Sequence, residues 1–235
     1  MSALTVVDAG SASTRINFEL HADPLGWKSE YRDGRQVLRI RSARPVESGL
    51  RGLIVGLDAG HPPGGTTGPS GLHEDSMTLA VAREAAARLR ALGATPLLIR
   101  EDASAVSLDE RIVRAAAADV HVYVSIHGNS PGAGRPPTAV SGTLIYWLEP
   151  NSSTLARAML DEVAQALGQP PTALLREDFA VIRTTWYPAV LVEGVGMVLP
   201  EREAYLRTPD GIAAYAEGIV AGLQRWLAEW PRQGP

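Results

Sequence analysis

The stretch LIVGLDAGHPPGGTTGPSGLHED, residues 53–75, decides how the rest of the chain is arranged. It opens as a short apolar run, breaks at DAGH (58–61) and crosses a loop rich in Gly, Pro and Thr. It then delivers His73, Glu74 and Asp75 where a helical pattern begins. A strand that ends in a His, followed by a carboxylate at a helix start, can be half of a metal site or an ordinary strand–loop–helix joint.

Composition narrows the possible functions. The chain has 235 residues, 45% of them hydrophobic, which is enough for one substantial core and a small appendage. Its net charge is −4 with both signs scattered, so the basic surface expected of a nucleic-acid-binding protein is missing. No apolar run reaches the roughly 18 residues of a membrane span, and no signal peptide is visible at the N-terminus. Cysteine is absent, so a metal must be held by His and carboxylate side chains.

From Leu53 onward, strand and helix patterns alternate. Strands are predicted at 53–57, 94–100, 119–127, 142–148 and 188–193, and helices at 73–92, 107–118, 154–167 and 209–230. The run PAVLVE (188–193) is apolar on both faces and therefore central. This alternation predicts an α/β fold of three layers, with a mostly parallel central sheet flanked by helices.

The N-terminal part has a different pattern. Residues 15–41 alternate like strands, and Asp33-Gly34 between two such arms is a strong hairpin signal. So few strands cannot bury enough apolar surface to stand alone. We therefore expect residues 1–48 to be a small β-hairpin appendage, or the remnant of an upstream β domain, plus linker, and residues 49–235 to be the catalytic domain.

Four residues of metal-site type fall at one edge of the predicted sheet. Sites in open α/β sheets form beyond the carboxyl ends of the strands. His61, His127 and Glu193 each end or follow a strand, and Glu74 begins the helix after the first strand. His121 lies roughly 20 Å from His127 along the same strand and is interpreted as structural.

Each of these residues also has an ordinary interpretation. His61 can be a solvated loop residue, and Glu74 and Asp75 can simply favour the helix N-terminus. Glu193, closing an apolar strand, must be exposed, paired with a base or close to a cation. Spacing alone does not decide between His73 and Glu74 as a third metal ligand, because neighbouring helix positions lie about 100° apart.

Four motifs in order carry a resemblance to a known family. They are DAGH (58–61), GPSGLHE (68–74), SIHGN (125–129) and PAVLVEG (188–194). Together they resemble the zinc-dependent N-acetylmuramoyl-L-alanine amidases of the Amidase_3 family, over about residues 53–228. The resemblance implies His61, Glu74 and His127 as zinc ligands and Glu193 as the catalytic carboxylate. The chain departs from the family at Ala59, at Gly128 and after Glu193, where it continues Gly194-Val195-Gly196-Met197.

The resemblance also implies a function. Two His and one carboxylate leave the fourth position of Zn²⁺ open, as in catalytic sites. The expected reaction is hydrolysis of the amide bond between N-acetylmuramic acid and L-alanine in peptidoglycan, with Glu193 moving the proton. Arg183 is a candidate substrate-binding residue or a surface charge, and Asp58 orients a ligand His or caps the turn.

Two rival functions stay open on the sequence. The same residues suit another zinc peptidase acting on cell-wall peptides, and the fold could serve a non-catalytic wall-binding module. The expected partner is peptidoglycan, with no nucleic acid and no membrane span. The expected state is a monomer in the cell envelope, either periplasmic or secreted.

Overall fold

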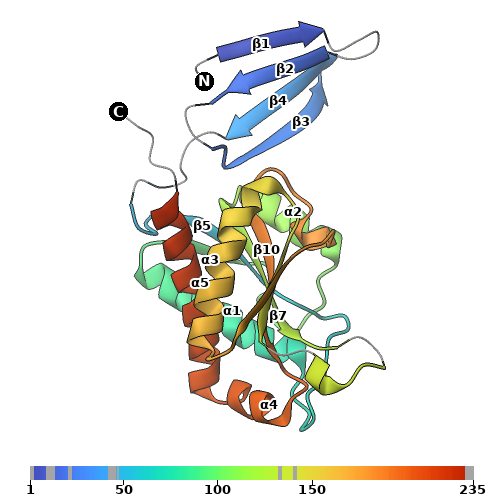
Figure 1. Ribbon diagram of the computed structural model, residues 1–235, viewed down its shortest axis with the longest axis vertical. Helices are drawn as coiled ribbons and strands as arrows, with labels where there is room; N and C mark the ends of the chain where they lie inside the picture. Colours follow the sequence, from blue (N-terminus) through green and yellow to red (C-terminus); the bar gives the residue numbers. More distant parts are fainter. Residues whose placement is uncertain are drawn as a thin grey trace.

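A computed structural model describes residues 3–8, 14–20, 23–41, 46, 48–131, 134–139 and 142–230 of the chain. Its centre is a six-stranded sheet in the order β6-β5-β7-β10-β8-β9; Figure 1 labels β5, β7 and β10 of this sheet. The strands are β5 (Ile54–Ala59), β6 (Thr95–Leu98), β7 (Val122–Asn129), β8 (Thr143–Trp147), β9 (Pro171–Arg176) and β10 (Ala189–Gly196). Neighbouring strands run parallel except at the β10–β8 pair, which is antiparallel.

Helices cover both faces of this sheet, as the alternating pattern predicts. On one face lie α1 (Glu74–Ala91), α3 (Ser153–Ala166) and α5 (Pro209–Glu229), with α5 packed between the other two. On the other face lie α2 (Leu108–Ala117) and the short 3-10 helix η3 (Ala180–Ile182). The remaining elements are α4 (Pro200–Leu206), η1 (Pro137–Ala139) and η2 (Pro150–Ser152). The three-layer α/β prediction is confirmed.

The side chains of each central strand alternate between two cores. Val190 and Val192 of β10 pack in the core with α1, α3 and α5, whereas Ala189 and Leu191 pack in the core with α2 and η3. Because side chains alternate along a strand, Glu193 lies on the α2 side with Leu191. This alternation explains why β10 is apolar on both faces and lies near the middle of the sheet.

The helix ends follow the expected capping chemistry. The Ser107 hydroxyl accepts a hydrogen bond from the N–H of Glu110 at the start of α2, and the Thr208 hydroxyl accepts one from Gly211 at the start of α5. Gly93 and Gly168 follow α1 and α3 with positive φ angles of 82° and 59°, which glycine adopts without steric cost. None of the described helices has the length and apolarity needed to cross a bilayer.

Two antiparallel strand pairs precede the main sheet and lie at one end of the molecule (Figure 1). They are β1 (Ala3–Asp8) with β2 (Thr14–Glu19), and β3 (Gly26–Arg32) with β4 (Arg35–Arg41). The predicted turn joins β3 and β4, where Asp33 and Gly34 both have positive φ. The strand β1 was not predicted.

The β3–β4 hairpin is attached to the main body at Trp186. This indole stacks with Lys28 and Arg41, whose charged groups lie 4.6 and 5.0 Å from its rings. The N–H of Trp27 donates to the carbonyl of Thr185 at 2.7 Å, and Leu25 is buried in the main core. The division at residue 48 stays a prediction, but the hairpin contributes to the packing of the larger part.

Candidate metal centre and active site

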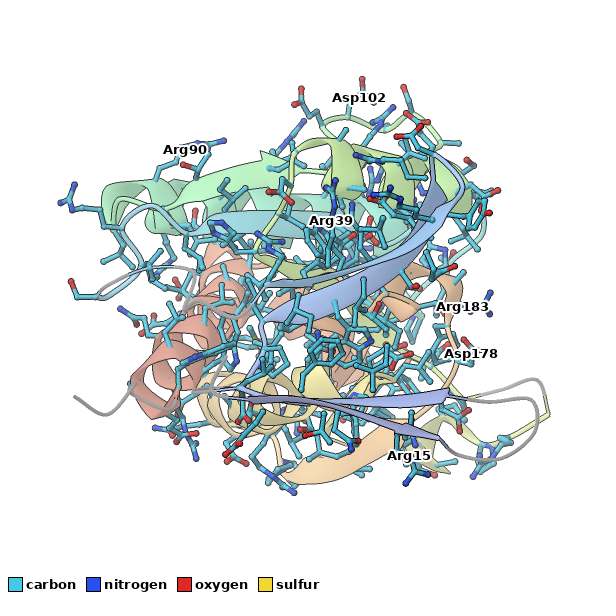
Figure 2. All side chains as sticks on the ribbon, turned by 90° about the horizontal axis from the view of Figure 1, so that it is seen from above. Arg15, Arg39, Arg90, Asp102, Asp178 and Arg183 are labelled. Atoms are coloured by element: carbon cyan, nitrogen blue, oxygen red, sulfur yellow. The ribbon has the colours of Figure 1, made fainter. Side chains whose placement is uncertain are left out.

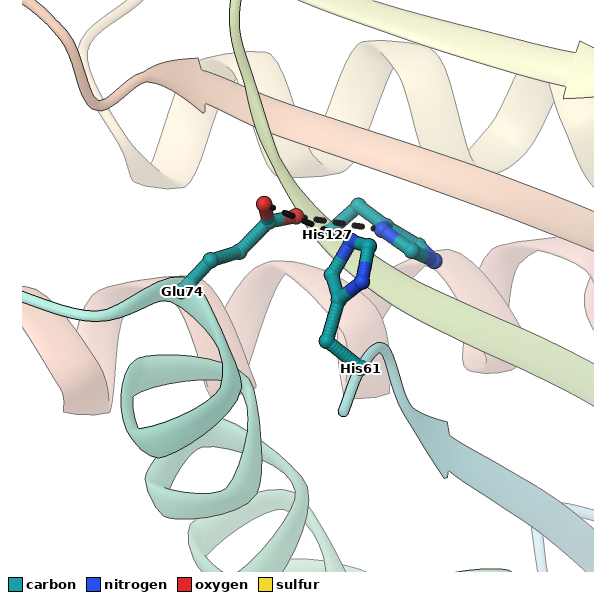
Figure 3. Close-up of side chains that lie close together, drawn as sticks. All are labelled: His61, Glu74 and His127. Carbon is teal, nitrogen blue, oxygen red and sulfur yellow. Dashed lines mark hydrogen bonds and ion pairs between the residues drawn. The ribbon is translucent and has the colours of Figure 1, made fainter. Parts of the chain in front are cut away.

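Three side chains from separate elements converge at the carboxyl edge of the sheet (Figure 3). His61 follows β5, Glu74 is the first residue of α1 and His127 lies in β7. One potential ligand atom from each lies within 4.8 Å of the other two. His61 Nε2 is 3.4 Å from Glu74 Oε2, and His127 Nδ1 is 3.1 Å from Glu74 Oε1. Zn²⁺ takes imidazole nitrogens and carboxylate oxygens as ligands, so this set of two His and one Glu fits such an ion by its chemistry.

Glu74 rather than His73 faces the two imidazoles. His73 is the N-cap of α1, with an extended backbone, and its Nδ1 lies 3.1 Å from the hydroxyl of Thr67. Glu74 is only 3% exposed, and its carboxylate accepts hydrogen bonds from the N–H groups of Thr66 (2.8 Å) and Gly128 (3.0 Å). Backbone donors on both oxygens therefore fix the orientation of this carboxylate.

The electrostatics of the three residues favour a deprotonated Glu74. Burial opposes ionisation of this carboxyl, but hydrogen bonding with His127 and His61 outweighs it and holds the pKa of Glu74 well below its usual range. The hydrogen bond with Glu74 raises the pKa of His61. His61 Nδ1 lies 3.1 Å from the carbonyl of Pro63, which can only accept a hydrogen bond. A neutral His61 therefore carries its proton on Nδ1 and leaves Nε2 free as a ligand.

Glu193 is aligned with His127 on the neighbouring strand. The two residues are register partners in the parallel β10–β7 pair, so their side chains leave the same face of the sheet. The Oε2 atom of Glu193 is buried and has no hydrogen-bond partner in the described part of the chain. Burial raises the pKa of Glu193 to about 7. A carboxyl with this pKa can both accept and donate a proton near neutral pH.

A cavity of about 560 Å³ opens beside these residues. His61, His127 and Glu193 line it, and much of the remaining wall is apolar. Leu108 and Phe179 stand at this cavity with 56% and 41% of their surface exposed. The cavity can therefore hold a substrate with apolar groups next to a carboxylate and two imidazoles.

Asp58 stabilises the framework behind the site. It is 1% exposed, forms an ion pair with Arg111 and accepts a hydrogen bond from the Ser125 hydroxyl at 2.8 Å. Neither of these interactions goes to His61 or His127. Nearby, a Cβ at Gly60 would collide with the His127 ring, so this position needs glycine for close approach.

Tyr215 of α5 ties together the strands that carry His127 and Glu193. Its hydroxyl lies 3.0 Å from the N–H of Gly194, which donates to it, and 2.8 Å from the carbonyl of His127. The β10–β7 register shifts between Glu193 and Gly196, so this hydroxyl replaces a lost ladder contact. A Cβ at Gly194 would collide with the Tyr215 ring. Gly194, one of the positions at which the chain departs from the family pattern, therefore makes room for the Tyr215 ring.

Arg183 and His121 lie apart from this cluster. Arg183 is exposed beside Asp178 at the periphery of the molecule, and its Nε donates to that carboxylate at 2.7 Å (Figure 2). It does not line the cavity. His121 accepts a hydrogen bond from the N–H of Ile54 at the opposite end of β5, as a structural residue would.

An open α/β sheet with clustered His and Glu side chains at its carboxyl edge is typical of hydrolytic metalloenzymes. The chain matches the family model Amidase_3, N-acetylmuramoyl-L-alanine amidase, over residues 55–225. It is 31% identical over 193 residues to the uncharacterised protein YqiI of Bacillus subtilis (strain 168), covering 79% of this chain and 88% of that protein. The chain spans 62% of the probable cell wall amidase LytH of Staphylococcus saprophyticus, with 28% identity.

Solved structures of N-acetylmuramoyl-L-alanine amidases are also similar to this chain. The catalytic domain of CwlV, an N-acetylmuramoyl-L-alanine amidase of Bacillus (Paenibacillus) polymyxa var. colistinus, is 29% identical with a TM-score of 0.67, covering 76% of this chain and 98% of that one. The amidase Ami1 of Mycobacterium smegmatis is 28% identical with a TM-score of 0.69, covering 77% and 99%. The chain therefore belongs to the Amidase_3 family of N-acetylmuramoyl-L-alanine amidases. It is an enzyme, an amidase that hydrolyses peptidoglycan.

Proposed function

We propose that the chain cleaves the amide bond between N-acetylmuramic acid and L-alanine with Zn²⁺ held by His61, Glu74 and His127, and with Glu193 as the catalytic carboxylate. The observation that supports this proposal most directly is the approach of three ligand atoms to within 4.8 Å of one another. Glu193 is the register partner of His127 on the adjacent strand. A bound Zn²⁺ supplies Lewis-acid chemistry, polarising the amide carbonyl and making water more acidic.

The chain's own residues transfer the proton, exclude water and contact the substrate. Glu193 accepts a proton from the attacking water and gives it to the departing amine of L-alanine, so that one carboxyl serves both steps. The pKa of about 7 that burial gives Glu193 suits both roles. The apolar wall with Leu108 and Phe179 excludes water around the scissile bond. Arg183, just after η3, contacts substrate groups outside the cavity.

The location follows from the substrate. Relatives include a probable cell wall amidase, and peptidoglycan lies outside the cytoplasmic membrane. We therefore propose that this chain acts in the cell envelope, and we also propose that it is a monomer.

Product analysis tests the proposal. Purified, zinc-loaded protein is incubated with peptidoglycan, and the soluble products are labelled at free amino groups and separated. New amino termini on L-alanine support the proposal, whereas new carboxyl termini within the stem peptide would show a peptidase instead. If the wild type and the Glu193→Gln variant release material at the same slow rate, the chain binds the wall without catalysis.

A further inference from the structure

Two buried arginines lie on either side of the turn that carries His61. Arg100 follows β6 and is 1% exposed, and Arg111 lies in α2 and is 2% exposed. A buried guanidinium must find acceptors for its five N–H donors, because it cannot lose its charge. The partners of these two side chains therefore indicate what they do.

All five N–H donors of Arg111 form hydrogen bonds with other groups of the protein. Its acceptors are Val106 O at 3.0 Å, the Asp58 carboxylate, Ala59 O at 2.8 Å, His61 O at 3.0 Å and Pro62 O at 3.1 Å. Arg111 lines the cavity, yet it has no donor left for a substrate. Its interactions are with the backbone on both sides of His61.

Arg100 forms further hydrogen bonds with the same turn and also with the first turn of α1. Its acceptors are Ala59 O at 3.3 Å, Gly60 O at 3.4 Å, Asp75 O at 2.6 Å, Asp102 O at 2.6 Å and the Thr78 hydroxyl at 3.5 Å. Together the two arginines bind the four consecutive carbonyls of residues 59–62. Arg100 also reaches the carbonyl of Asp75, which follows Glu74, so the two turns that present His61 and Glu74 share one support.

The backbone of His61 needs such support. Its φ angle is +58°, in the left-handed region that disfavours every residue with a Cβ. Non-glycine residues keep this conformation where surrounding contacts fix it. The carbonyls of His61 and Pro62 both accept hydrogen bonds from Arg111 Nη2, so the guanidinium supplies contacts of this kind.

We propose that Arg100 and Arg111 are positioning residues that set the orientation of His61 and Glu74 before the metal binds. This inference rests on the proposed function, because it assumes that these two side chains hold Zn²⁺. It predicts that the planar five-donor geometry matters and not only the positive charge. Lysine keeps the charge but offers three donors from a single nitrogen, and it cannot bind the same carbonyls.

The zinc affinity of the Arg111→Lys and Arg100→Lys variants of the whole chain tests the inference. Metal-free proteins are titrated with Zn²⁺ against a chromophoric chelator, and the visible spectrum of the Co²⁺-loaded forms reports ligand geometry. We expect the zinc Kd to rise roughly 10–100-fold in both variants, as when a group that orients a ligand is lost. The Co²⁺ spectrum should change, and kcat should fall more than KM rises.

Arg114→Lys is the matched control. Arg114 lies one turn after Arg111 in α2, half exposed; it pairs with Glu110 and donates to the carbonyl of Ile99 at 2.9 Å, and none of its hydrogen bonds in the described residues goes to the carbonyls of residues 59–62. Its substitution should leave zinc affinity and the Co²⁺ spectrum unchanged. If the Arg100→Lys and Arg111→Lys variants fold and bind Zn²⁺ as tightly as the wild type, with the same Co²⁺ spectrum, the inference alone is overturned. A wild type that binds no Zn²⁺ would overturn the proposed function and this inference with it.

Amide exchange covers the case in which both lysine variants fail to fold. The N–H groups of Gly60 and Glu74 donate to Ile126 O and Thr66 O, both at 2.9 Å. If the arginines build the site in advance, these two amides are as protected in the metal-free wild type as in the zinc-loaded protein. Protection that is present only with Zn²⁺ would show that the metal, not the arginine pair, orders the two turns.

Discussion

Replacing Glu193 by Gln should make the metal-free protein more stable while it removes activity. The carboxyl has a buried Oε2 without a partner in the described residues, and burial raises its pKa from 4.5 to about 7. A rise of this size corresponds to an ionisation cost of about 3 kcal/mol, at 1.36 kcal/mol per pKa unit. Because part of the side chain faces the cavity, we expect the substitution to raise the free energy of unfolding by about 1–3 kcal/mol at a pH where Glu193 is ionised. Gln has the same shape and cannot ionise.

The sign of the pH dependence follows from the direction of the pKa shift. The folded state holds the Glu193 proton more tightly than the unfolded state, so the contribution of Glu193 to the free energy of unfolding falls as pH rises from 4.5 to about 7. The Glu193→Gln variant cannot ionise at this position, so it does not lose stability in this way. The stability difference between Glu193→Gln and wild type should therefore be small near pH 4.5, grow through pH 7 and stay constant above it.

Urea unfolding of chelator-treated protein at several pH values between about 5 and 8 measures this difference. Glu201→Gln, an exposed position on α4, is the control and should change stability by less than about 0.5 kcal/mol at every pH. A Glu193→Gln protein no more stable than wild type at the upper end of this range, or a difference that does not vary with pH, would refute the reasoning. In the zinc-loaded form the same variant should lose about 10²–10⁴-fold in kcat.

Three further results are expected. His127→Ala should lose stoichiometric zinc, measured by elemental analysis, while His121→Ala should keep it; the reverse would place the metal elsewhere. Tyr215→Phe should lower the free energy of unfolding by about 1–3 kcal/mol, measured in urea, because the Gly194 N–H loses its buried acceptor; an unchanged midpoint would contradict this. For Glu203, burial opposes ionisation, but N–H donors of the 70–72 loop outweigh it and lower its pKa. Glu203→Gln should therefore lower Tm at pH 7, and this difference should vanish as pH falls through the folded-state pKa; a pH-independent difference would contradict the role.

The main sheet and its helices could be predicted because their apolar periodicity is strong. The predicted strand 188–193 and helix 73–92 correspond to β10 and α1, with ends that differ by up to three residues. The strand β9 was missed because its residues are half-buried or exposed at the sheet edge and show no clear alternation. The helix α4 was missed because seven residues, three of them charged, carry too little periodicity.

The supporting residues of the candidate site were less predictable than its proposed ligands. Motif order suggested His61, Glu74, His127 and Glu193, but spacing could not separate His73 from Glu74. That choice depends on the N-cap geometry, which turns His73 toward Thr67. Arg100 and Arg111 gave no usable signal, because a buried arginine looks the same in sequence as an exposed one such as Arg114.

The alignment of His127 with Glu193 has a consequence for how the enzyme could be redesigned. Their backbones are held by the β7–β10 ladder, whose strand spacing of about 4.8 Å does not depend on any loop. The sheet therefore fixes the distance between the proposed proton-transfer residue, Glu193, and the proposed metal ligand, His127. Rim segments, such as the one around Phe179, could be exchanged between relatives to alter substrate choice while this spacing is inherited unchanged.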